Sequence, residues 1–178
     1  MKVLVPLALL AVAGLLLSLA VRLGAFLPVE LTVGEAGPFY LVYRRHEGAY
    51  YKIAPVISAV EAWAKERGEG CALTFGEYLD DARTADEDRL RSNGGCVLDH
   101  PVGPPGDGLF ARTLPRRLYV IASFRGAPSI GPYKAYPKAE KWMKETGYAR
   151  DGATIETYRI ESEKGVQTLY YFPVLRAP

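Results

Sequence analysis

The sequence predicts an α+β protein made of two similar strand-helix-strand-strand units, preceded by one transmembrane helix. Three observations lead to this fold class. The chain begins with a long uncharged apolar run, from Val3 to Val21. Beyond it, short aromatic or β-branched segments alternate with segments of helical periodicity. Finally, the second half of the chain repeats landmarks of the first at an offset of about 80 residues.

The apolar run lies between Lys2 and Arg22. About 20 helical residues cross the roughly 30 Å hydrocarbon core of a bilayer, so this run predicts a transmembrane signal anchor. A cleaved signal peptide is the alternative, since Ser18-Leu19-Ala20 loosely resembles a cleavage site, and a buried core helix is a further one.

The organisation expected from this reading has three parts. Residues 1–27 form the membrane helix, residues 28–38 a Gly- and Pro-containing linker, and residues 39–178 the folded domain. The protein is then a single-pass membrane protein. Its orientation stays open, because one basic residue flanks each end of the run.

Composition excludes several kinds of site. Without Lys2 and Arg22, the 22 basic residues become 20 and balance the 20 acidic residues, so the domain lacks the basic surface of a nucleic-acid-binding protein. Cys71 and Cys96 have no zinc-site spacing, and we expect neither a metal site nor a cofactor. The plainer interpretation makes both cysteines small buried residues, and a single disulfide is the alternative.

The expected elements follow one another in the same order in both halves. The first half contains a strand, a helix and two strands, at Phe39–Arg44, Ile53–Lys65, Ala72–Leu79 and Gly95–Leu98. After a Pro/Gly-rich loop, the second half contains a strand, a helix carrying Trp142 and two strands, with the strands at Leu118–Phe124, Ala153–Ile160 and Gln167–Val174. The loop is His100–Gly108.

The repeat rests on residues that recur at nearly equal spacing. They are Trp63, Gly68 and Tyr78 in the first half, and Trp142, Gly147 and Tyr158 in the second. Two such units packed side by side predict two antiparallel sheets, each with a helix on one face. The opposite faces of the two sheets are then expected to meet in a groove.

No nucleophile-base motif is present, so the sequence predicts no catalytic residues. It does contain 12 tyrosines, and several of them fall in predicted strands. Glu156 alternates onto the same strand face as Tyr158, which would place a carboxylate among aromatic rings. We therefore expect Glu156, Tyr158, Tyr43 and Tyr171 to bind a ligand. The alternative for Glu156 is a solvated residue at a strand edge.

Short motifs in the second half resemble the GyrI-like small-molecule-binding domain. They are Gly131-Pro132-Tyr133, Trp142–Tyr148, Glu156-Thr157-Tyr158 and Tyr171–Val174, and the likeness covers roughly residues 39–174. The resemblance implies a two-unit fold around a ligand cleft, with Glu156 contacting cationic compounds. Together with the N-terminal helix, it makes the chain similar to the vertebrate testis-expressed ER-phagy receptor and its bacterial relatives. The acidic tail of that receptor is missing, so its autophagy function is not expected here.

The leading functional hypothesis is a membrane-anchored, non-enzymatic domain that holds a flat cationic or amphiphilic small molecule in the groove. One alternative is a hydrolase of reactive small molecules that uses groove carboxylates. Only Glu156 qualifies for that role, because its repeat counterpart is Gly76, and Glu77 is expected on the opposite face. A membrane-tethered adaptor that holds a protein partner is the other alternative. No helix-turn-helix pattern is present, so a transcription regulator is not expected.

Overall fold

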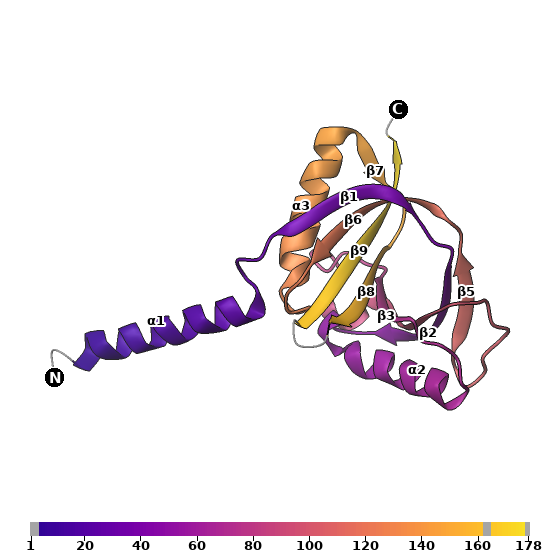
Figure 1. Cartoon of the computed structure of the whole chain (residues 1–178), viewed down its shortest axis with the longest axis horizontal. Coiled ribbons are helices and arrows are strands. Elements are labelled where there is room, and N and C mark those ends of the chain that lie inside the picture. The colour runs from indigo at the N-terminus through magenta and orange to yellow at the C-terminus, as the bar shows by residue number, and fades with distance from the viewer. Residues whose placement is uncertain (1–3, 162–164, 177–178) are drawn as a thin grey trace.

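The computed structural model of the chain describes residues 4–161 and 165–176. It shows a curled antiparallel sheet with two helices packed against it, and a further helix, α1 (Leu4–Leu23), that projects away from the sheet (Figure 1). The packed helices are α2 (Ala54–Glu66) and α3 (Gly131–Thr146), and two 3-10 turns are η1 (Tyr50–Lys52) and η2 (Glu87–Arg89). The strands are β1 (Val29–Ala36), β2 (Phe39–Glu47), β3 (Leu73–Tyr78), β4 (Arg91–Leu98), β5 (Phe110–Leu114), β6 (Arg117–Phe124), β7 (Tyr148–Arg150), β8 (Thr154–Glu161) and β9 (Gly165–Arg176). The α+β class is as predicted.

The N-terminal segment differs from the prediction. Among residues 4–161 and 165–176, no helix is both long enough and apolar enough to cross a membrane. The transmembrane helix expected over residues 1–27 is therefore not found. Residues 4–27 form α1 and a turn that leads into the sheet, and residues 1–3 lie outside the described part of the chain. Lys134 of α3 fixes that turn by donating hydrogen bonds to the carbonyl oxygens of Ala25 and Leu27.

The predicted linker over residues 28–38 is instead mostly strand. β1 pairs antiparallel with β6 along its whole length, from Val29 opposite Phe124 to Ala36 opposite Arg117. The pairing buries Val29, which joins the apolar core beneath α3. The glycines and proline around this segment suggested a linker, but the alternating apolar residues between them form an edge strand. The short strand β5 was also not predicted.

The strands form one continuous sheet, so the prediction of two separate sheets is wrong. Their order is β1-β6-β9-β8-β3-β4-β2-β5, with β7 paired to β9 outside this path. The two halves of the chain join where β3 pairs with β8. Because this single sheet is curled, the faces of its two halves still meet, and the ring of Phe39 on β2 lies edge-on to the rings of Tyr119 on β6 and Tyr171 on β9.

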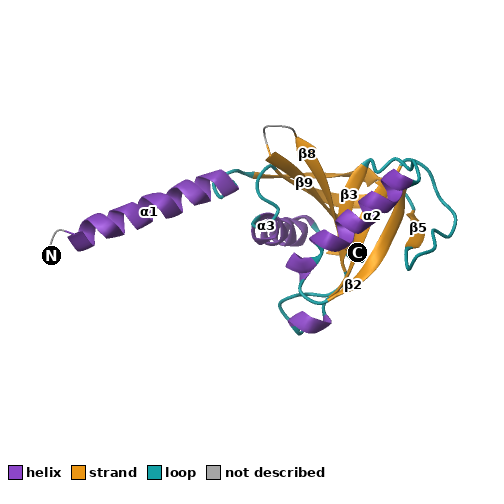
Figure 2. Cartoon of the chain, turned by 90° about the horizontal axis from the view of Figure 1, so that it is seen from below, coloured by secondary structure: helices purple, strands orange, loops and turns teal. Residues whose placement is uncertain are grey.

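The repeated order of elements is nevertheless present. The first unit reads β2-α2-β3-β4 and the second β6-α3-β8-β9, with the short strand β7 inserted between α3 and β8. Both helices pack on the same side of the sheet (Figure 2), which we call the helix face. The opposite face carries its own apolar cluster, which includes Phe39, Phe75, Tyr119 and Tyr171.

Cys71 and Cys96 form a disulfide. It ties the segment before β3 to β4 in the apolar cluster beneath α2. The interpretation of the two cysteines as separate buried thiols is therefore wrong, and the alternative, a single disulfide, is present in the structure. Sequence spacing could not decide between them, because the bond depends on how β3 and β4 are aligned in the sheet.

Candidate functional site

Glu156 lies near the middle of the sheet, on the helix face. It is opposite Gly76 of β3 on one side and Tyr170 of β9 on the other. Its side chain is buried, with only 3% of the residue exposed. A Cβ atom at Gly76 would lie 2.9 Å from the hydroxyl oxygen of Tyr78, so glycine here leaves room for Tyr78 to lean across β3 toward β8. An ionisable group in this central position needs partners.

Tyrosine hydroxyls supply those partners. The Tyr136 hydroxyl donates to Oε1 of Glu156 at 2.9 Å, and the Tyr158 hydroxyl donates to Oε2 at 3.2 Å. The hydroxyl oxygens of Tyr78 and Tyr158 are 2.9 Å apart. Because the single Tyr158 proton points to the carboxylate, Tyr78 is the donor in that pair. The result is a hydrogen-bond chain from Tyr78 through Tyr158 to Glu156.

Two more tyrosines extend this aromatic group. The Tyr50 ring meets the Tyr78 ring edge-on, with 4.7 Å between centroids, and the Tyr136 ring meets Tyr170 in the same way at 6.0 Å. Tyr50 comes from η1 in the first unit, whereas Tyr136 comes from α3 in the second. The two units thus each bring rings to one carboxylate, where β3 and β8 meet.

Burial controls the ionisation of this cluster. It raises the pKa of Glu156 to about 7, although the hydrogen bonds from Tyr136 and Tyr158 act in the opposite direction. Burial, followed by repulsion from the Glu156 charge, raises the pKa of Tyr136 and Tyr158 well above the usual value for tyrosine. The hydroxyls therefore stay protonated and act as donors. Glu156 is poised between its neutral and charged forms near pH 7.

The four predicted ligand residues do not share one site. Tyr158 lies beside Glu156 as predicted from strand alternation. Tyr43 and Tyr171 belong to the apolar cluster on the opposite face of the sheet. Side chains alternate along a strand, so the positions of Tyr43 and Tyr171 on their strands direct both rings to this opposite face. The prediction chose these two residues from their residue type alone.

The opposite face contains a second buried carboxylate, that of Glu77. Nη2 of Arg112 lies 2.5 Å from its Oε1, and Nδ2 of Asn93 lies 2.6 Å from its Oε2. Glu77 therefore points away from Glu156 as predicted, but it is a buried ion-pair residue. The guanidinium of Arg112 also packs on the Tyr43 ring, 5.3 Å from its centroid. With both oxygens occupied, Glu77 is a structural carboxylate.

The family match covers most of this architecture. The profile of the GyrI-like small molecule binding domain matches residues 30–175. The chain belongs to this family. Its GyrI-like domain thus begins with β1, which sequence analysis had assigned to a linker, and continues through β9. A search of curated protein sequences finds no match.

Solved structures share the fold of this GyrI-like domain. The crystal structure of the EcmrR C-terminal domain has a TM-score of 0.69 at 17% identity, over 84% of this chain and 99% of that one. EcmrR in its DNA complex has a TM-score of 0.71 at 14% identity, over 95% of this chain and 65% of that one. SAV2435 bound to tetraphenylphosphonium has a TM-score of 0.53 at 13% identity, over 82% of this chain and 94% of that one. At such identities the likeness extends to the fold alone. Neither these structures nor the family match supports the predicted likeness to the ER-phagy receptor.

Sequence reasoning missed most of the aromatic residues around Glu156 in the GyrI-like domain. Tyr78 could have been found, because it is the repeat counterpart of Tyr158. Tyr170 could have been found only with the register of β8 against β9, since it pairs directly with Glu156. Tyr136 and Tyr50 lie outside the strands, and no pattern in the sequence marks them.

Proposed function

We propose that this GyrI-like domain binds an aromatic organic cation, with Glu156 as the counter-ion and the surrounding tyrosines as the aromatic walls. The observation that carries the proposal is a buried carboxylate held by two tyrosine hydroxyls at the junction of the two units. With its pKa raised to about 7, the Glu156 carboxyl is only partly ionised near neutral pH, and a positive charge placed beside it favours the ionised form. A ligand cation can supply that charge, and the tyrosine faces favour it further through cation–π attraction.

One relative of the same fold has a bound ligand of this chemical class. SAV2435, which has the same fold, is bound to the lipophilic cation tetraphenylphosphonium in its solved structure. Tetraphenylphosphonium is therefore a suitable probe. Triphenylphosphine oxide is a suitable neutral comparison, because it has similar aromatic groups without the positive charge.

Hydrolysis is less well supported by the arrangement of acidic groups. A two-carboxylate mechanism needs a second acid beside the first. In the described part of the chain, Glu77 is the other carboxylate buried in the central strands, and it lies on the opposite face in an ion pair with Arg112. Binding without turnover is therefore the function that the geometry favours.

The test compares the two probes on the wild-type chain and two variants. Glu156→Gln keeps the size of the side chain and removes its charge. It should weaken tetraphenylphosphonium binding at least about tenfold, which is ~1.4 kcal/mol, and leave triphenylphosphine oxide little affected. Tyr158→Ala should weaken both probes, since burial of aromatic surface does not depend on charge.

The matched control is Glu30→Gln, at an exposed position of β1 far from the tyrosines in the sheet order. It should bind both probes like the wild type. Equal effects of Glu156→Gln and Glu30→Gln on tetraphenylphosphonium would overturn the proposal.

A further inference from the structure

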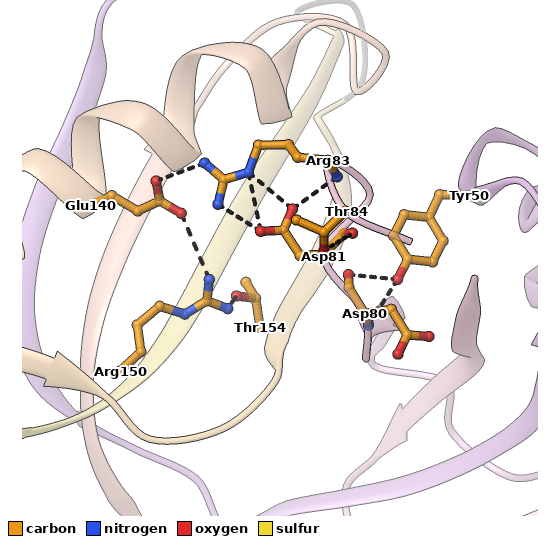
Figure 3. Close-up of polar contacts among 8 residues, drawn as sticks. All are labelled: Tyr50, Asp80, Asp81, Arg83, Thr84, Glu140, Arg150 and Thr154. Atoms are coloured by element: carbon orange, nitrogen blue, oxygen red, sulfur yellow. Dashed lines mark hydrogen bonds and ion pairs between the residues drawn. The ribbon is translucent and has the colours of Figure 1, made fainter. Parts of the chain in front are cut away.

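Glu156 is closed off from solvent in this structure, so a ligand reaches it only when parts of the domain move apart. The rings that cover it come from both units: Tyr50 and Tyr78 from the first, and Tyr136 and Tyr158 from the second. Any contact that bridges the two units beside these rings resists that opening. A network of charged side chains forms such a bridge (Figure 3).

The network starts on the loop over residues 79–90, which connects β3 to β4. Asp81 and Arg83 of this loop form a bidentate ion pair, with Nη2 and Oδ2 separated by 2.8 Å. Arg83 also reaches across to α3, where its Nη1 lies 3.5 Å from Oε2 of Glu140. In Figure 3, the Arg83 guanidinium lies between the two carboxylates. The loop of the first unit is thereby attached to the helix of the second.

Glu140 also anchors the far end of the bridge. Its Oε1 lies 3.8 Å from Nη1 of Arg150, and Nη2 of Arg150 donates to Oγ1 of Thr154 at 2.7 Å. Thr154 is buried on β8, two residues before Glu156 and on the same face. Glu140 is one helical turn after Tyr136, whose hydroxyl holds Glu156. The bridge thus runs beside the binding site.

The loop over residues 79–90 also contacts the tyrosine rings that cover Glu156. The Tyr50 hydroxyl donates to the carbonyl oxygen of Asp80 at 2.8 Å and accepts from its amide at 3.0 Å. The Tyr50 ring packs against Tyr78, which donates to Tyr158. Movement of the loop away from α3 therefore displaces the rings over Glu156.

We infer that Asp81, Arg83, Glu140 and Arg150 form an electrostatic latch that controls ligand access to Glu156. The latch holds the loop over residues 79–90 against α3, and its opening sets the rate at which a cation enters. The four charges cancel, and all four side chains are partly exposed, from 33% for Glu140 to 71% for Arg83. Such pairs are individually weak and screened by salt, which suits a contact that opens readily. The inference rests on the proposed binding function, but opening can also be measured without a ligand.

The ligand-free test is amide hydrogen exchange of the full chain. Glu140→Gln removes the acceptor shared by Arg83 and Arg150. It should speed exchange at the amides of Asp80 and Thr84 by about three- to tenfold. In the wild type, 0.5 M NaCl should produce a similar rise. Glu145→Gln is the matched control, because Glu145 lies on the same helix, is exposed, and forms its ion pair within that helix, with Lys141 at 3.9 Å. Equal exchange in Glu140→Gln and Glu145→Gln would overturn the latch.

The ligand test is stopped-flow tyrosine fluorescence with tetraphenylphosphonium. Glu140→Gln should raise its association rate about three- to tenfold, because the closed state loses its bridge. Faster exchange with an unchanged association rate would show that the loop moves without controlling entry, which overturns the inference. If the wild type binds no cation while exchange still responds to Glu140→Gln, the proposed function fails, and with it the role of the network in ligand access. The two failures are thus distinguishable.

Discussion

The raised pKa of Glu156 makes folding stability depend on pH in a particular direction. Burial moves this pKa from 4.5 to about 7, so the folded chain binds a proton more tightly than the unfolded chain. The contribution of Glu156 is therefore most favourable below pH 4.5 and is lost as the pH rises through 7. At about 1.4 kcal/mol per pKa unit, the whole effect is about 3.5 kcal/mol. Most of it, about 2 to 3 kcal/mol, falls between pH 5 and pH 8.

The assay is urea unfolding of the wild type and Glu156→Gln at pH 5 and at pH 8. Other groups titrate over this range, so the informative quantity is the difference between the two proteins. The free energy of unfolding of the wild type should fall by about 2 to 3 kcal/mol more than that of Glu156→Gln, because glutamine does not ionise. Parallel pH profiles for the two proteins would refute the assignment of a buried, proton-binding carboxyl to this position.

Three further predictions concern the structure around the site. Gly131→Ala should destabilise the fold by about 1 to 3 kcal/mol in thermal or urea unfolding, because its Cβ would lie 2.0 Å from the Tyr170 hydroxyl; a gain in stability, as helix propensity alone predicts, would contradict this packing. Reduction of the Cys71–Cys96 disulfide, verified by mass, should cost about 3 kcal/mol for a loop of 25 residues, and an unchanged melting temperature would speak against the bond. Glu77→Gln should destabilise the domain by roughly 1 to 3 kcal/mol by leaving Arg112 partly unpaired, and it should not change cation affinity. A loss of affinity would indicate that the ligand binds on the face of the sheet opposite Glu156.

Local patterns in the sequence predicted the elements of the domain well. Apolar residues at spacings of three and four predicted a helix at Ile53–Lys65, and α2 lies at Ala54–Glu66. Alternation and β-propensity predicted the strands of both units. The failures came where several elements determine the outcome together. β1 is a strand because β6 provides a pairing partner, and the two units share one sheet because β3 and β8 hydrogen bond to each other. Alternation along one segment does not identify the strand with which it pairs.

The candidate site was predictable only in part, for a related reason. The period of two along a strand correctly grouped Glu156 with Tyr158. That period does not show which residues of distant strands share a face, so it could not reveal that Tyr43 and Tyr171 lie on the opposite face of the sheet. Tyr136 reaches Glu156 from α3, and this contact depends on how the helix packs over the sheet. The hydrogen bond from Tyr136 to Glu156 could therefore be found only from the three-dimensional structure.

The most direct test of the central claim is the number of protons released when a cation binds. If Glu156 has a pKa of about 7 and becomes fully ionised beside the ligand, each bound cation should displace about half a proton at pH 7. Calorimetric titration with tetraphenylphosphonium, repeated in buffers of different ionisation enthalpy, measures this number. The account predicts a release of about half a proton for the wild type and none for Glu156→Gln. Binding by the wild type without proton release, or with the same release in Glu156→Gln, would contradict the role of Glu156 as the counter-ion.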